Sequence, residues 1–150
     1  MESSSAKVFR WLREDHAKIN ELLCLVKSSP AHLKPQTLVE LTQLVRRSIS
    51  IEESLLYGYL EEKLNGFEIA AEAVAQHEIL GELLQRVTNH PAYRPEWIQS
   101  VEELRIKFES HSRWEQKELF GVMEEIFNPT EFDDLLERYQ KIRDEKNVTA

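Results

Sequence analysis

The sequence has few of the residues that interrupt helices or cross-link chains. It contains four glycines, five prolines and one cysteine, Cys24, in 150 residues. A single cysteine cannot form an internal disulfide, which favours a reducing compartment. The first fifteen residues lack an apolar stretch resembling a signal peptide, and no run of about 18 apolar residues occurs. We therefore expect a cytoplasmic protein that does not enter the membrane.

Positive charge is also scarce. Lysine and arginine number 19 against 27 aspartates and glutamates, so the formal net charge is −8. This balance argues against nucleic acid or an anionic membrane as the main partner, because both repel acidic surfaces. The sequence has no nucleophile pattern, phosphate-binding loop or dinucleotide fingerprint. We assign no catalytic residues and favour a binding protein over an enzyme.

The apolar residues follow helical spacing throughout, and no stretch reads as a strand. We expect an all-α protein, an antiparallel up-down-up-down four-helix bundle with an additional C-terminal helix, forming a single domain over residues 1–150. On the second helix the inward positions continue to Tyr59, and on the fourth they continue to Val122. The four bundle helices are expected at 3–29, about 35–64, about 68–87 and 95 to about 127, with the bundle core at 9–127 and the C-terminal helix at about 129–144.

Polar residues interrupt the inward faces near the middle of each bundle helix. Two carboxylates in an apolar core each cost several kcal/mol unless they are protonated or neutralised by a cation. No lysine or arginine lies on these faces, so we expect a metal ion there. The alternative is a metal-free network in which protonated glutamates bond to imidazoles. The five candidate metal ligands are His16, Glu52, His77, His111 and Glu115.

The two halves of the chain repeat each other. Residues 52–62 and 115–125 share the first glutamate, a Leu-aromatic-Gly step and a closing Glu-Glu pair. A helix with a histidine precedes each segment, which indicates two helix hairpins of the same design. The repeat is incomplete at one point, because the position that matches His111 is Ser48.

These residues resemble the hemerythrin-like proteins, or HHE cation-binding domains, over about residues 9–127. The resemblance implies a carboxylate-bridged non-heme di-iron centre that binds oxygen reversibly, or that senses or stores oxygen, nitric oxide or iron. It also implies that His16 is the first-helix ligand, Glu52 a bridging carboxylate and His77 the third-helix ligand. His111 and Glu115 would be the fourth-helix pair. Two expected histidines are replaced, by Ser48 and Ala73. The segments that carry the resemblance are Asp15-His16, Glu52-Glu53 with Leu56-Tyr57, His77-Glu78, and His111 to Glu115 with Leu119-Phe120.

Three imidazoles and two carboxylates suit one divalent ion, whereas two irons would have to share the same five residues. Manganese or zinc could occupy the set as well as iron. The expected partners are a metal ion and a small diatomic ligand or peroxide. Two alternatives remain open: a ferritin-like oxidoreductase acting on Fe(II) or peroxide, and a degenerate bundle without tight metal that serves as an interaction domain.

Several other residues have simpler expectations. Tyr57 reads as a core residue, and its functional reading is as a shield that keeps water from the metal. Two irons would rely on water, hydroxide or additional ligands such as Glu53 or Tyr57. Glu53 reads as a solvated neighbour of Glu52, and Cys24 as a buried, inert thiol. His32 and His90 read as solvated turn residues.

Overall fold

The computed structural model describes residues 1–28, 35–89 and 95–149, and within these ranges it contains helices and turns without a strand. His32 and His90 lie outside the described residues. None of the helices in the described ranges is long and apolar enough to cross a membrane. The elements are α1 (Ser4–Ser28), α2 (Pro35–Ile51), η2 (Glu52–Leu56), α3 (Tyr57–Glu61), α4 (Phe67–Asn89), α5 (Pro95–Trp114), η3 (Glu115–Leu119), α6 (Phe120–Ile126) and α7 (Pro129–Thr149).

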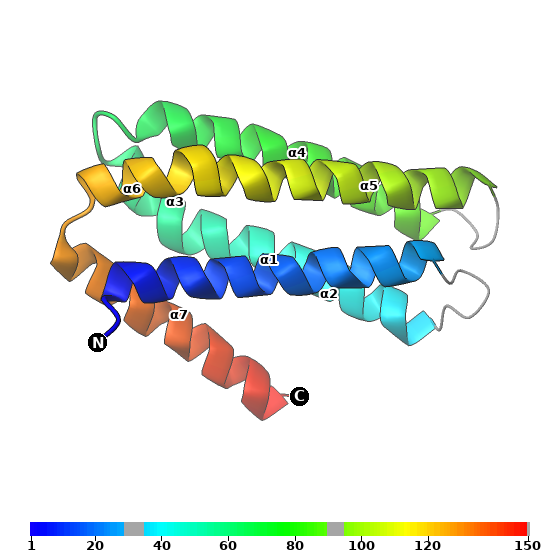
Figure 1. The fold of residues 1–150 in the computed structure, drawn as a ribbon, viewed down its shortest axis with the longest axis horizontal. Coiled ribbons are helices and arrows are strands. Elements are labelled where there is room, and N and C mark those ends of the chain that lie inside the picture. Colours follow the sequence, from blue (N-terminus) through cyan, green and yellow to red (C-terminus); the bar gives the residue numbers. More distant parts are fainter. Residues whose placement is uncertain (29–34, 90–94, 150) are drawn as a thin grey trace.

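Four long helical segments run alternately up and down, in chain order (Figure 1). The segments are α1, then α2 with η2 and α3, then α4, then α5 with η3 and α6. Helix α1 packs beside α2 and α5, and α4 packs beside α5 and α2. Helix α7 crosses the outside of the bundle at an angle and packs on α1 and η2. The predicted all-α bundle with an additional C-terminal helix is confirmed.

The core is divided into two apolar clusters, one toward each end of the bundle. On α1, Leu12 belongs to one cluster and Ile19 to the other, and His16 lies between them. Helical spacing predicts inward positions on the first and third helices, and all of them are buried: Phe9, Leu12, His16, Ile19, Leu23 and Val26 on α1, and Ala70, Ala73, His77, Leu80, Leu84 and Val87 on α4. The polar layer in the middle of the bundle is therefore closed off by apolar side chains on both sides.

The second and fourth helices each contain a π-helical turn that the sequence spacing did not predict. The turns η2 and η3 begin at Glu52 and Glu115, the matching glutamates of the repeat. A π-turn bonds residue i to i+5 and so holds one residue more than an α-turn. The inward positions beyond it move along by one residue: Leu60 and Met123 are fully buried, whereas Tyr59 and Val122 are only half-buried. Our placement of those two residues was wrong for this reason.

Helix α7 begins at a capping box and is fastened to α1 beside His16. The Asn128 side chain accepts a hydrogen bond from the Glu131 N–H at 2.8 Å, and Glu131 accepts one from the Asn128 N–H at 3.0 Å. The Tyr139 hydroxyl donates to Asp15. The helix continues to Thr149, five residues beyond the predicted end.

The thiol of Cys24 is exposed, so the expectation of a buried cysteine was wrong. The neighbouring Leu23 is fully buried. Successive residues of an α-helix are about 100° apart around its axis, and this rotation carries Cys24 to the solvent side of α1.

Candidate metal centre

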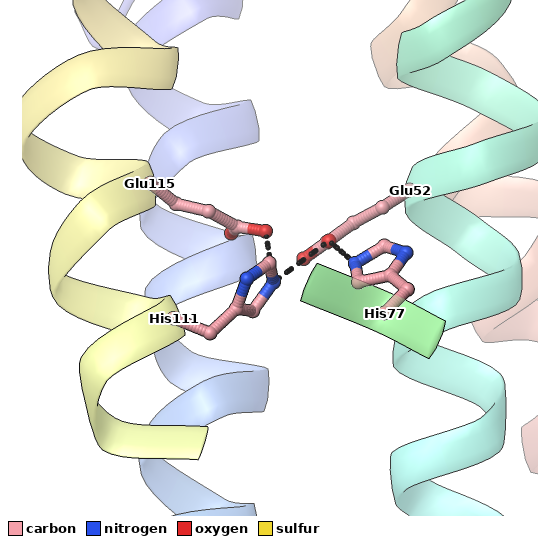
Figure 2. A group of neighbouring side chains, drawn as sticks. All are labelled: Glu52, His77, His111 and Glu115. Carbon is pink, nitrogen blue, oxygen red and sulfur yellow. Dashed lines mark hydrogen bonds and ion pairs between the residues drawn. The ribbon is translucent and has the colours of Figure 1, made fainter. Parts of the chain in front are cut away.

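The structure brings all five candidate ligands into one buried layer. Each comes from the middle of a bundle segment, and none is more than 4% exposed. His16 lies on α1, Glu52 begins η2, His77 lies on α4, and His111 and Glu115 lie on either side of the junction between α5 and η3. Figure 2 shows Glu52, His77, His111 and Glu115 pointing toward one another. They come from η2, from α4 and from the junction between α5 and η3.

Glu52 lies at the centre of the layer, with its two oxygens facing opposite sides. Its Oε1 is 2.8 Å from Nε2 of His16. Its Oε2 is 2.8 Å from Nε2 of His77 and 3.5 Å from Nε2 of His111. One carboxylate thus separates a side that has two histidines, His77 and His111, from a side that has one, His16.

The two carboxylate oxygens of Glu115 also face opposite sides of the layer. Its Oε1 is 2.6 Å from Nε2 of His111, and its Oε2 is 3.6 Å from Nδ1 of His16. The 2.6 Å contact with His111 lacks hydrogen-bond geometry, so among the described residues neither Glu115 oxygen has a hydrogen-bond partner. Nδ1 of His16 has none there either. Buried polar atoms without partners are rare and costly in folded proteins, so these three atoms point to a ligand.

The charges of this layer are strongly coupled. Burial, together with the charge of Glu52, raises the pKa of Glu115 well above its ordinary 4.5. Burial opposes ionisation of Glu52 too, but the hydrogen-bonding groups around it hold its pKa well below the ordinary value. Burial likewise opposes protonation of His16, yet the carboxylates of Glu115 and Glu52 raise its pKa. Without a metal ion, the surroundings therefore favour the ionised form of Glu52 and the protonated forms of Glu115 and His16.

The two-histidine side can hold a metal ion. Glu52, His77, His111 and Glu115 each offer one ligand atom, and these atoms all lie within 4.8 Å of one another (Figure 2). Imidazole and carboxylate donors suit iron, zinc and manganese. His16 stands apart from this group and faces the other oxygens of the same two carboxylates.

The one-histidine side is incomplete. Ser48, one turn before Glu52, is buried and offers a hydroxyl where an imidazole was expected. A cavity of about 30 Å³ beside it lies between α1 and α2. Ala73, the other replaced position, lies one turn before His77 on α4, so it bears on the two-histidine side, and it is fully buried in an apolar cluster. His16 is therefore the one imidazole among the described residues that faces the one-histidine side.

Tyr57, which helical spacing predicts mainly as a core residue, places its hydroxyl in the site. Its oxygen lies 3.2 Å from Nε2 of His77 and 3.4 Å from Oε2 of Glu52. The π-turn explains this position, because a residue five places after Glu52 returns to the same face. Its counterpart in the repeat, Phe120, stacks instead on Phe9 with ring centroids 4.5 Å apart.

Two further residues contact the histidines from outside. Gln76 accepts a hydrogen bond from Nδ1 of His111 at 2.6 Å, and Glu53 accepts one from Nδ1 of His77 at 3.2 Å. Glu53 is exposed as expected, with 42% of its side chain accessible, and its carboxylate also contacts His77. The one sequence signal that could have identified Gln76 and Glu53 is their position, since each adjoins a candidate ligand in the sequence.

In a comparison with protein families, the model described as the hemerythrin HHE cation binding domain matches residues 7–121. The matched residues include all five candidate ligands and both π-turns, and α7 lies beyond them. No curated protein and no solved structure matched the chain.

Proposed function

The chain belongs to the hemerythrin HHE cation-binding domain family, and from this premise we propose that it binds non-heme iron inside the bundle. We propose further that the bound iron binds oxygen, nitric oxide or peroxide. The observation that carries the proposal is the buried group Glu52, His77, His111 and Glu115, whose ligand atoms converge and whose Glu115 oxygens have no hydrogen-bond partner in the described ranges.

The donor set favours one iron on the two-histidine side. Two imidazoles and two carboxylates would hold it there and would balance its charge. The other side offers His16 and the second oxygen of each carboxylate, with Ser48 in place of a further imidazole. Iron(II) held by such donors with open positions supplies the chemistry of oxygen binding and reduction.

The surrounding residues orient the ligands and exclude water. The apolar clusters at both ends of the bundle close the layer. Tyr57 places an O–H beside Glu52 and His77, where it can donate to a carboxylate or to a small bound molecule. We also infer that residues 1–150 form one domain, because Phe132, Leu135 and Tyr139 of α7 share an apolar cluster with α1 and η2.

Metal content is the direct test. Protein purified without chelator and reconstituted anaerobically with Fe(II) is expected to hold one iron per chain, to lose it in His77→Ala, and to develop a visible absorption band on exposure to oxygen. Two irons per chain would mean that the one-histidine side also binds iron, although Ser48 stands where an imidazole was expected. No bound metal would favour the metal-free network or an interaction domain.

Ser48→His tests whether the one-histidine side lacks a metal ion because it lacks a second imidazole. An imidazole at this position would complete the one-histidine side, so we expect iron content to rise from one to two per chain. Ser50→His, on the exposed face of the same helix, is the matched control and should leave the content at one. An unchanged content in Ser48→His would contradict our alignment of the two halves.

Iron binding should compete with protons. Because the pKa of Glu115 is raised well above 4.5, this carboxyl is protonated below the raised value and must release its proton to bind metal. The apparent affinity should therefore fall as the pH falls through this range, by about tenfold per pH unit for each proton displaced. Calorimetric titration in two buffers of different ionisation enthalpy measures the number of protons released on iron binding. An iron affinity that does not change with pH would contradict the prediction.

A further inference from the structure

The two histidines of the two-histidine side share a feature that His16 lacks. Their Nδ1 atoms bond outward, at 2.6 Å from His111 to Gln76 and at 3.2 Å from His77 to Glu53. Nδ1 of His16 has no hydrogen-bond partner in the part of the chain that the structure describes. The imidazoles are thus held differently on the two sides of the carboxylates.

The outer contacts decide which ring nitrogen can bind a metal. A carboxylate oxygen and an amide oxygen can only accept, so Nδ1 of each histidine must carry the proton and donate. In a neutral imidazole this leaves the lone pair on Nε2. Both Nε2 atoms face carboxylate oxygens, 2.8 Å from Glu52 for His77 and 2.6 Å from Glu115 for His111. Lone pairs that face one another at these distances require a proton or a metal ion between them.

The outer acceptors come from the same segments as the ligands. Glu53 follows Glu52 on η2 and supports the histidine of α4, whereas Gln76 precedes His77 on α4 and supports the histidine of α5. Gln76 also lines a pocket of about 150 Å³ between α4 and α5 that reaches His111. On its other flank, the His111 ring stacks near Trp114 with centroids 6.1 Å apart. The Gln76 hydrogen bond therefore sets the rotation of a ring that would otherwise border open space.

We propose that Gln76 and Glu53 are positioning residues, which hold His111 and His77 with Nε2 toward the metal. They make the two-histidine side the first to be filled. This inference rests on the proposed function, because it concerns the same metal ion. General experience with metal sites is that such outer partners fix the histidine tautomer and that losing one costs about 10- to 100-fold in affinity.

Co(II) added to the full-length protein is the probe, since its visible bands report ligand geometry and its affinity can be titrated. Gln76→Leu is expected to weaken Co(II) binding about 10- to 100-fold and to change the visible spectrum, with little change in the melting temperature of the metal-free protein. Gln76→Glu keeps an acceptor at the same place and should restore the affinity. Gln85→Leu, an exposed position on the same helix, should bind as the wild type does.

The second pair of variants tests the other contact. Glu53→Leu should weaken Co(II) binding by up to about tenfold, the lower end of the range because the side chain is partly solvated. Glu53→Gln, which retains an acceptor oxygen, should recover most of the loss. Glu61→Leu, exposed on α3, controls for removal of a surface charge.

The outcomes separate this inference from the proposed function. Wild-type protein that binds no Co(II) would overturn both. Wild-type protein that binds Co(II), with Gln76→Leu and Glu53→Leu equal to it in affinity and spectrum, would overturn only the positioning role. Equal losses in Gln76→Leu and Gln76→Glu, accompanied by a lower melting temperature without metal, would also overturn it, because they indicate a packing role.

Discussion

Glu115→Gln is expected to bind no iron and yet to melt at a higher temperature than the metal-free wild-type protein. Glu115 is fully buried, and its oxygens lack hydrogen-bond partners among the described residues. Its negative charge is useful only when a metal ion neutralises it. A glutamine of the same shape avoids the cost of burying that charge but cannot replace the anionic ligand. Metal affinity should therefore fall by more than the roughly 10- to 100-fold that the loss of an outer partner costs.

The stability gain should depend on pH in a defined direction. The native pKa of Glu115 is raised above its ordinary 4.5, so the native state binds this proton more tightly than the unfolded state does. The carboxyl therefore costs nothing below about pH 4.5, and its cost grows as the pH rises toward the raised native pKa. Above that range we expect Glu115→Gln to gain about 1–3 kcal/mol, or about 2–4 °C per kcal/mol for a chain of this size.

Thermal unfolding of metal-free protein between about pH 4 and 8 measures this effect. Glu118→Gln, exposed in the same π-turn, is the matched control and should shift stability by no more than about 0.5 kcal/mol. A Glu115→Gln protein that is less stable than metal-free wild type at neutral pH would contradict the prediction. That result would mean that the Glu115 carboxyl is a necessary member of a metal-free network.

Deletion of Lys117 is expected to leave a folded bundle, whereas deletion of Lys107 is expected to abolish cooperative folding. Both lysines are exposed and lie on the same helical segment, Lys117 in η3 and Lys107 in α5. They differ in the turn that would lose a residue. A π-turn contains one residue more than an α-turn, so η3 can close into an α-turn when one residue is removed.

The burial pattern supports this contrast. After Glu115, the buried side chains are Leu119, Phe120 and Met123, and deletion of Lys117 would bring them to the third, fourth and seventh positions of an α-helix, which share one face with Glu115. Deletion of Lys107 would instead rotate the following residues by about 100°. Phe108, His111 and Glu115 would then leave the interior, at a cost beyond the roughly 5–15 kcal/mol that stabilise a typical domain.

Circular dichroism during thermal unfolding distinguishes the two deletions. We expect the Lys117 deletion to unfold cooperatively within about 2 kcal/mol of the metal-free wild type, a usual range for single changes. Its metal affinity should drop at least about tenfold because the π-turn no longer sets the direction of Glu115. Loss of folding in both deletions would show that η3 is not a one-residue insertion in an α-helix.

Helical periodicity by itself determined the architecture of this protein and which residues form its buried polar layer. The spacing of Leu12, His16 and Ile19 on the first helix is local information, and the structure buries all three. The same spacing placed Glu52, His77, His111 and Glu115 on inward faces, and antiparallel helices of similar length bring such positions to one level. The near absence of glycine and proline left few other helix boundaries to consider.

Only the tertiary structure decided which atoms of these side chains face one another in the polar layer. The π-turns at Glu52 and Glu115 interrupt the regular α-helices. They change the direction in which the following side chains point, so that the hydroxyl of Tyr57 lies beside His77. The contacts of Gln76 and Glu53 depend on which ring nitrogen of another helix faces them. Sequence spacing specifies the face on which a residue lies to within one position, but hydrogen-bond partners are chosen by distances of a few tenths of an ångström across helices. For this reason the sequence determined which residues meet, and the packing of the helices determined that they meet as a two-histidine side and a one-histidine side.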